Sequence, residues 1–291
     1  MARGSACLLV LAIVLLAVLA GASSGGAAAS SQSSPFAGLG TWIDIYSAEW
    51  ADPEAAVAAM AQHHVRTLYL ETGNYSHTGP VFKPRYASRF IDAAHAAGLK
   101  VVAWYLPSFT KIGRDERKAL GAIHFQSATG QHFDGFALDI EATKVRSLSL
   151  RNHRLHQLSS RIRYAVGSTY PLGAITPSPV GMSPSYWPEI PYSTLSHYYK
   201  AFLPMAYFTL RGIHSRSGTR AFVAATVSDI RDASGRPNFP IHMIGGLSGS
   251  MGRKATGGFM RAVTQTQIAG YSLYAFGQTT PAAWRALSRH S

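Results

Sequence analysis

Short apolar segments alternate with longer mixed segments along most of this chain. The apolar segments are rich in Val, Ile, Leu, Tyr and Trp and are too short for most helices, which is typical of strands buried on both faces of a parallel sheet. We expect strands at residues 39–46, 65–71, 100–106, 133–143, 171–176, 202–208, 240–247 and 270–276.

An expected helix follows each expected strand. These helices cover residues 53–63, 85–97, 114–127, 148–166, 192–199, 218–232, 253–267 and 281–289. Asp52 before Pro53 is a typical helix start, and Gly98 is a typical stop. Eight strand–helix pairs predict one α/β domain, a (β/α)8 TIM barrel. A doubly wound open sheet is the alternative, although no glycine-rich nucleotide-binding fingerprint follows the first expected strand.

The first residues have the pattern of a secretory signal peptide, which we place at residues 1–22. Arg3 supplies the positive charge, residues 8–19 form an apolar core, and Ala20-Gly21-Ala22 is a small-residue cleavage site. The apolar core is shorter than the roughly 20 residues that span a bilayer, which disfavours an uncleaved anchor. Residues 23–34 read as a flexible Gly/Ala/Ser leader. The barrel domain is then expected at residues 35–291, without the single cysteine, Cys7.

The formal net charge of +13 narrows the class of partner. A basic exported protein suits anionic surfaces such as cell-wall polymers or lipid headgroups. Nucleic acid is disfavoured because of the export signal and the scattered basic residues. We expect a monomer that is secreted or associated with the cell wall, has no membrane span in its mature form, and binds a polysaccharide or cell-wall glycan.

The most informative stretch is residues 133–143, Phe-Asp-Gly-Phe-Ala-Leu-Asp-Ile-Glu-Ala-Thr. Read as a strand, it places Ala137, Asp139 and Glu141 on one face and only apolar residues on the other. Two acids at a strand end are costly unless they are paired or hydrated, so they indicate a site. The alternative is that Asp139 caps a helix and Glu141 is an acid in its first turn.

Active sites of closed parallel barrels lie at the carboxyl ends of the strands. Acids, tyrosines and an amide occur there, and they suit a sugar, whose hydroxyl groups need short polar partners and whose C–H faces stack on aromatic rings. The candidate substrate-binding residues from these positions are Asp44, Tyr46, Glu71, Tyr105, Tyr274 and Gln278. No spacing of metal-ligand type recurs, and we expect neither a metal nor a cofactor.

Glu141 is the best candidate for a general acid in glycoside hydrolysis. Such an acid must stay protonated near neutral pH, and a second charge at Asp139 would raise the pKa of one member of the pair. The seventh expected strand offers no acid as a second catalytic carboxylate. Asp44 or Glu71 could serve instead, or the substrate could supply its own nucleophile.

Residues 134–141 resemble the fourth-strand signature of family 18 glycoside hydrolases, the chitinase-like enzymes, which reads Asp-Gly-x-Asp-x-Asp-x-Glu. Met205-Ala206-Tyr207 is similar to the Met-x-Tyr of that family. The resemblance implies a general acid at Glu141, an Asp139 that orients the acetamido group of the substrate as internal nucleophile, and a Tyr207 that hydrogen-bonds this group. It also brings Met205 into the expected binding site. Ala137 stands where the family usually has another Asp.

A partial similarity to family 25 lysozymes is carried by other residues. Residues 42–46, Trp-Ile-Asp-Ile-Tyr, are similar to their first-strand Gly-Ile-Asp-Val-Ser, and Asp139-Ile140-Glu141 to their Asp-x-Glu. This resemblance implies Glu141 as the acid, assisted by Asp44 or Asp139. Together these patterns predict a secreted glycoside hydrolase that acts on a glycan with N-acetylated sugars. A carbohydrate-binding or cell-wall-binding barrel without catalysis is the alternative, favoured by Ala137 and by the acid-free seventh strand.

Overall fold

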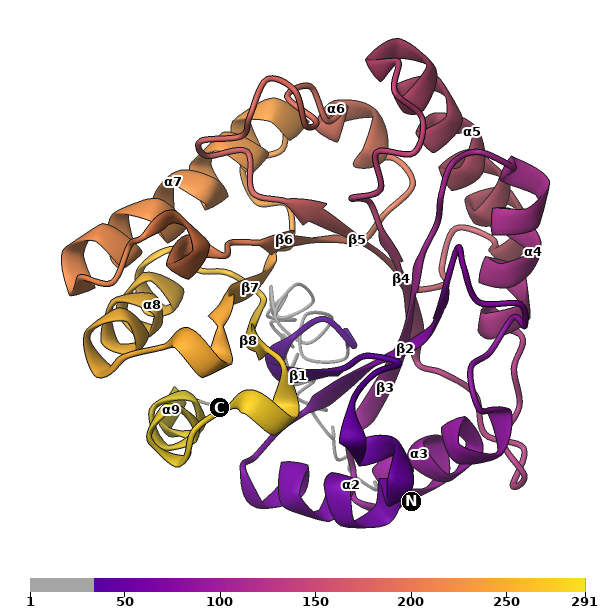
Figure 1. The fold of residues 1–291 in the computed structure, drawn as a ribbon, viewed down its shortest axis with the longest axis horizontal. Coiled ribbons are helices and arrows are strands. Elements are labelled where there is room, and N and C mark those ends of the chain that lie inside the picture. Colours follow the sequence, from indigo (N-terminus) through magenta and orange to yellow (C-terminus); the bar gives the residue numbers. More distant parts are fainter. Residues whose placement is uncertain (1–33, 291) are drawn as a thin grey trace, which may run out of the picture.

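The computed structural model describes residues 34–290, and these form a closed barrel of eight parallel strands inside a ring of helices (Figure 1). Each strand pairs with the next in sequence, and the eighth pairs with the first. The predicted TIM barrel is therefore confirmed. The signal peptide and most of the leader lie outside the described residues. Among residues 34–290, no helix has the length and apolar character needed to cross a bilayer.

The strands are shorter than the apolar segments that predicted them. Their bounds are β1 Gly38–Ile43, β2 Thr67–Asn74, β3 Lys100–Leu106, β4 Gly135–Asp139, β5 Leu172–Pro177, β6 Ala201–Met205, β7 His242–Leu247 and β8 Gly270–Tyr274. As a result, Asp44, Tyr46, Glu141 and Tyr207 lie in the loops directly after their strands. These loops all leave the same end of the barrel, because the strands are parallel.

The outer helices follow the predicted order, with ends that differ by a few residues. Their bounds are α2 Pro53–Gln62, α3 Pro84–Ala96, α4 Ile112–Ile123, α5 Leu148–Val166, α6 Tyr192–Leu195, α7 Arg216–Ser234, α8 Arg253–Gln265 and α9 Pro281–Leu287. The Asp52 side chain caps α2 by accepting a hydrogen bond from the Ala55 amide, as its sequence predicts. The cap of α5 is Ser147, so the alternative role of Asp139 as a helix cap is wrong.

The apolar side chains form two cores, one between strands and helices and one inside the barrel. The inner core needs a very small residue on β5. A Cβ atom on Gly173 would come within 2.7 Å of Leu203 Cδ1 and 2.8 Å of Phe36 Cε1. Glycine at this position therefore lets Phe36 and Leu203 fill the barrel at normal packing density.

A buried hydrogen-bond network closes the barrel below its centre. The His242 ring meets the carbonyl oxygen of Phe36 (3.0 Å) and the Tyr69 hydroxyl (3.1 Å) through Nδ1, and the Ser272 hydroxyl (2.9 Å) through Nε2. Ser272 also accepts a hydrogen bond from the Trp42 indole at 2.7 Å. A neutral ring that carries its proton on Nδ1 satisfies these partners. The Trp42 ring stacks on Tyr69 at 4.2 Å, both rings are buried, and Trp42 also packs against Trp104 and Tyr274.

Candidate active site

A cavity of about 350 Å³ opens at the carboxyl ends of the strands. Most of the candidate residues meet there, although they come from strands and loops all around the barrel. The cavity is lined by Asp44, Tyr46, Glu71, Asn74, Tyr75, Ser76, Trp104, Leu106, Asp139, Glu141, Met205, Tyr207 and Tyr274. Four of these side chains are carboxylates, and none is Lys, Arg or His. The site therefore concentrates acidic groups in an otherwise basic protein.

Asp44 is held by several donors just beyond β1. Its Oδ1 accepts hydrogen bonds from the Tyr46 amide (2.9 Å) and the Ser47 hydroxyl (3.0 Å). Its Oδ2 accepts a hydrogen bond from the Tyr274 hydroxyl at 2.6 Å. Burial and this hydrogen bond to Asp44 raise the pKa of Tyr274. Asp44 thus fixes the Tyr274 ring on the cavity wall, while Tyr46 is 82 % exposed at the rim.

Glu71 is buried on β2 without a basic partner. Its Oε2 accepts a hydrogen bond from the Ile45 amide at 3.0 Å. Burial raises the pKa of Glu71 to about 7, and the charges of Asp44 and Glu141 add to this effect, while the Ile45 amide and the Asn74 side chain oppose it. A carboxyl group with such a pKa can hold or release a proton near neutral pH.

Asp139 and Glu141 stand at the end of β4 and just beyond it. Burial raises the pKa of Asp139, and the charges of Glu141 and Glu71 raise it further. Burial also raises the pKa of Glu141. The buried Oδ1 atom of Asp139 has no hydrogen-bond partner among the described residues. The raised pKa values favour the protonated form of these acids, and Asp139, which lines the cavity, keeps one oxygen without a partner.

Aromatic side chains form the walls around these acids. The rings of Tyr207 and Tyr274 lie 6.3 Å apart between centroids. Burial raises the pKa of Tyr207, and the charges of Asp139 and Glu141 raise it further. The hydroxyl group of Tyr207 therefore keeps its proton and can donate a hydrogen bond. Trp104 is 5 % exposed and packs edge-on against Trp42. Flat rings beside short polar groups are suited to binding a sugar.

Two of the candidate binding residues lie away from this cavity. Tyr105 faces the helix layer, where its hydroxyl group donates to Asp115 Oδ1 at 2.8 Å, so its assignment to the site is wrong. Its neighbour Trp104 faces the cavity instead, because successive residues of a strand point to opposite sides. Gln278 is exposed in a short helical turn after β8 and does not line the cavity either.

Three residues that the sequence patterns did not single out also line the cavity. Tyr75 and Ser76 follow β2, and Leu106 ends β3. Their position directly after strand residues was the available signal, because loops at this end of a parallel barrel form its site.

Ala137, which stands where the family 18 signature has an acid, is part of the inner core of the barrel. It pairs in register with Trp104 on β3 and with Gly173 on β5, and it is fully buried in the inner core. An Asp at this position would lie among the mostly apolar side chains of the inner core and would have to find a polar partner there. The same substitution leaves Asp139 without the neighbouring acid that the resemblance to family 18 would place two residues earlier.

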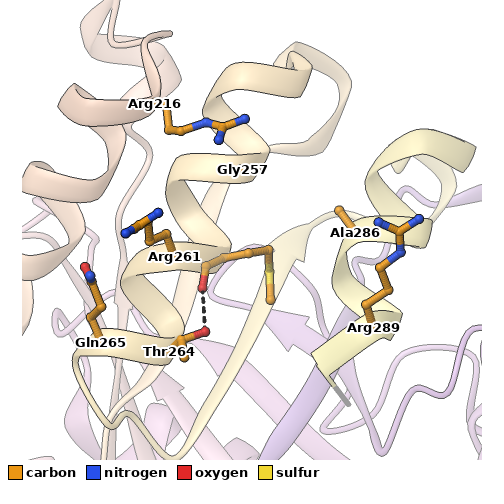
Figure 2. A pocket seen from close by; sticks show the side chains of 8 residues that line it. Arg216, Gly257, Arg261, Thr264, Gln265, Ala286 and Arg289 are labelled. Carbon is orange, nitrogen blue, oxygen red and sulfur yellow. Dashed lines mark hydrogen bonds between the residues drawn. The ribbon is translucent and has the colours of Figure 1, made fainter.

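Another cavity, of about 490 Å³, lies between the outer helices α7, α8 and α9 (Figure 2). It contains three arginines, Arg216, Arg261 and Arg289, and no acidic side chain. It therefore has no proton donor of the kind that glycoside hydrolysis requires. Nor do the described residues include a cluster of three or more His, Cys, Asp or Glu side chains suited to a metal ion.

Comparisons of sequence found no matching family model and no matching curated protein. Comparisons of structure found many barrels of the chitinase type. The spore cortex-lytic enzyme SleL of Bacillus cereus has a TM-score of 0.65 at 8 % identity and covers 87 % of this chain and 74 % of its own. A chitinase from Bacteroides thetaiotaomicron has a TM-score of 0.63 at 9 % identity, with 87 % and 96 % covered. A family 18 chitinase from Pseudoalteromonas aurantia has a TM-score of 0.60 at 12 % identity, with 87 % and 100 % covered.

These similarities establish the fold. The chain has the barrel of chitinase-like glycoside hydrolases, as the resemblance to family 18 implied. The catalytic domain of a β-amylase from Paenibacillus polymyxa matches with a TM-score of 0.59 at 10 % identity and covers 88 % of this chain and 98 % of its own. Since one fold hosts several activities, the function has to be argued from the site.

Proposed function

We propose that this protein is a secreted glycoside hydrolase that acts on a glycan with N-acetylated sugars, with Glu141 as the general acid. The proposal combines the signal-peptide pattern of residues 1–22 with the acidic cavity at the mouth of the barrel. A monomer that binds a polysaccharide, needs no metal or cofactor and does not act on nucleic acid accounts for these features.

One observation carries the proposal. Asp139 and Glu141 lie two residues apart in sequence and both line the cavity, their pKa values are both raised, and Asp139 Oδ1 has no partner among the described residues. A buried polar atom without a partner costs about 1–3 kcal/mol, so a site of this kind is expected to gain a partner when substrate binds. The N–H of an acetamido group is a donor of suitable size and charge.

The proposed reaction uses the substrate as its own nucleophile. Glu141 donates its proton to the glycosidic oxygen, and the C–O bond to the leaving sugar breaks. The acetamido carbonyl oxygen, oriented through its N–H by Asp139 and through the Tyr207 hydroxyl, forms a bond to the anomeric carbon. Glu141, now ionised, takes a proton from water, and this water opens the cyclic intermediate. Microscopic reversibility requires the same residue as acid and base in the two steps.

The dependence on the acetamido group tests this mechanism. Chitotetraose and its fully N-deacetylated counterpart have the same backbone and differ only in the group that would act as nucleophile. We expect reducing ends to be released from chitotetraose at a rate at least about 100-fold above that from the deacetylated sugar, since loss of an intramolecular nucleophile removes several kcal/mol of assistance. Equal rates would contradict substrate assistance.

A binding protein without catalysis is the second candidate. It is favoured by Ala137, which replaces an acid of the family 18 signature, and by β7, whose residues His242–Leu247 include no carboxylate. Such a protein would bind chitotetraose in calorimetry and would release no reducing ends between pH 4 and pH 9. The two functions are therefore separated by measuring binding and turnover on the same sample.

A further inference from the structure

A second hollow adjoins the cavity of about 350 Å³ that holds Asp139 and Glu141, which is called the catalytic cavity from here on. The second hollow has a volume of about 530 Å³, and its lining residues come from the loop after β2 and from the first turns of α4. Tyr75 and Ser76 line both hollows. A polymer seated over the carboxylates would reach the second hollow by crossing these two residues. Its walls, unlike those of the catalytic cavity, contain Arg114, Arg117 and Lys118.

The two arginines of this hollow have no acidic partner among the described residues. Asp115 is engaged by the Tyr105 hydroxyl and by the Phe109 amide, and Glu116 pairs with Arg161 at 3.0 Å. The Nε atom of Arg114 is buried and has no hydrogen-bond partner within residues 34–290. Arg114 thus keeps a desolvated donor unused, and Arg117 is exposed beside it.

Residues 74–77, which lie between the two hollows, are held in place by several hydrogen bonds. The Lys118 ammonium donates to the Asn74 carbonyl oxygen at 3.0 Å and also to that of His77. Asn74 Oδ1 accepts hydrogen bonds from the amides of Ser76 (2.9 Å) and His77 (3.2 Å). Lys118 is therefore occupied in holding the loop, which leaves the arginines to bind a ligand. A site positioned before binding saves ordering entropy.

Charge decides what this arrangement can bind. Each ionised acid of the catalytic cavity repels an anionic group placed beside it, whereas the two guanidinium groups of the second hollow attract one. We propose that the glycan substrate is acidic, and that Arg114 and Arg117 bind a carboxylate carried by one of its sugars while a neutral N-acetylated sugar lies over Glu141. This inference rests on the proposed function and adds the class of substrate to it.

The test is a binding measurement that does not need turnover. It uses the full chain with Glu141→Gln and two probes: chitotetraose, and the tetrasaccharide that alternates N-acetylglucosamine with N-acetylmuramic acid. The second probe has the same sugar backbone and differs from the first by the 3-O-lactyl groups of its N-acetylmuramic acid units, each of which ends in a carboxylate. We expect it to bind about tenfold more tightly in calorimetry at low salt, because charge-assisted hydrogen bonds to Arg are among the stronger ones in proteins. The advantage should shrink as salt is added.

The arginine variants assign this advantage to the second hollow. Arg114→Gln with Arg117→Gln should reduce it to about twofold or less and leave the affinity for chitotetraose unchanged. The control pair Arg220→Gln with Arg285→Gln removes the same charge from exposed positions on α7 and α9, outside both hollows, and should keep the advantage. Thermal unfolding of each variant confirms that it is folded.

Three results would overturn the inference. Equal affinity of the parent protein for both probes would remove the acidic substrate while leaving the proposed function intact. An advantage that survives the Arg114 and Arg117 changes, or that disappears equally in the control pair, would remove the role of this hollow. Failure of both probes to bind would contradict the proposed function as well.

Discussion

At the scale of single residues, the proposed active site is defined by acids that are buried without counter-charges. Asp115 is buried as well, but it is engaged by the Tyr105 hydroxyl and the Phe109 amide. Glu71 and Asp139, by contrast, face other acids across the cavity, and their pKa values are raised. Such an arrangement costs stability when the acids ionise, which is typical of sites selected for function.

Glu71→Gln should make the protein more stable at high pH. The folded pKa of Glu71 is about 7 and its ordinary value is 4.5, so the folded state holds the proton more tightly. The stabilisation that this tighter proton binding gives the folded state is fully present below pH 4.5 and is lost as pH rises through about 7. Gln imitates the protonated acid. The melting temperature of the variant should exceed that of the parent by several degrees at pH 8, and the difference should vanish near pH 4.

Melting curves of the parent and the variant at pH 4, 6 and 8 measure this effect. Glu49→Gln is the control, because Glu49 is an acid that is only half-buried. A difference that is the same at every pH would show that Glu71 ionises normally in the folded protein.

At this scale the sequence predicts part of the site. Alternation and strand ends locate Asp44, Glu71, Asp139, Glu141 and Tyr274 correctly at the cavity. They do not decide between Trp104 and Tyr105, because both faces of a barrel strand are apolar and the alternation has no polar side that marks its phase. Only the register between neighbouring strands fixes which of the two points inward.

At the scale of elements, the loop after β5 supports the loop that carries Glu141. The Tyr186 hydroxyl donates a hydrogen bond to the Glu141 carbonyl oxygen at 2.9 Å. Arg151 of α5 is buried, donates to the carbonyl oxygens of Tyr186 (2.6 Å) and Val145 (2.9 Å), and stacks on the Trp187 ring at 4.6 Å. The proposed general acid, Glu141, is thus positioned by contacts between residues far apart in the sequence.

Tyr186→Phe should lower kcat about 3- to 10-fold on chitotetraose, because one hydrogen bond contributes about 0.5–1.5 kcal/mol and its loss frees the Glu141 backbone. KM should change little, since Tyr186 does not line the cavity. Tyr164→Phe is the control, because Tyr164 is 92 % exposed on α5 and makes no such contact. Unchanged kcat in Tyr186→Phe would show that this loop does not position Glu141.

The sequence predicts these elements better than their ends. Eight strand–helix pairs follow from the alternation, but β4 ends at Asp139 and β6 at Met205, earlier than the apolar runs indicate. The runs continue because Ile140 and Phe208 are buried outside the sheet. The sequence indicates which residues are buried, but it does not show which residues pair between strands. Only the pairing determines where each strand ends.

At the scale of the whole molecule, the buried hydrogen-bond network of His242 links the stability of the protein to pH. Burial lowers the pKa of His242 to about 4, below its ordinary value of 6.5. The folded state therefore binds this proton more weakly than the unfolded state. The stabilisation that the neutral His242 ring gives the folded state is fully present above about pH 6.5 and is lost as pH falls toward 4. This slope is opposite to that of Glu71 in nearly the same pH range.

His242→Gln should weaken this dependence on acid. The variant should lose stability overall, because three buried hydrogen bonds are disturbed, but its free energy of unfolding should fall less steeply between pH 6.5 and pH 4 than that of the parent. Urea unfolding at several pH values measures both slopes. Identical slopes would show that His242 is not the group responsible.

The closed ring is the property that the sequence predicts most completely, because strand count, spacing and helix order all agree with it. Its charge distribution is less predictable. The overall charge of +13 indicates an anionic partner, but it does not reveal an acidic cavity beside an arginine-lined hollow. That contrast depends on which side chains the fold brings together.

The most direct test of the account is the pH profile of kcat/KM for chitotetraose in the parent protein and in Glu141→Gln. Burial raises the pKa of Glu141, so the parent should lose activity as pH rises through a value above 4.5. Glu141→Gln should lower kcat/KM by at least about 100-fold, the scale of a lost general acid, with an unchanged fold by circular dichroism. A variant as active as the parent, with the same profile, would contradict the role of Glu141 as the proton donor.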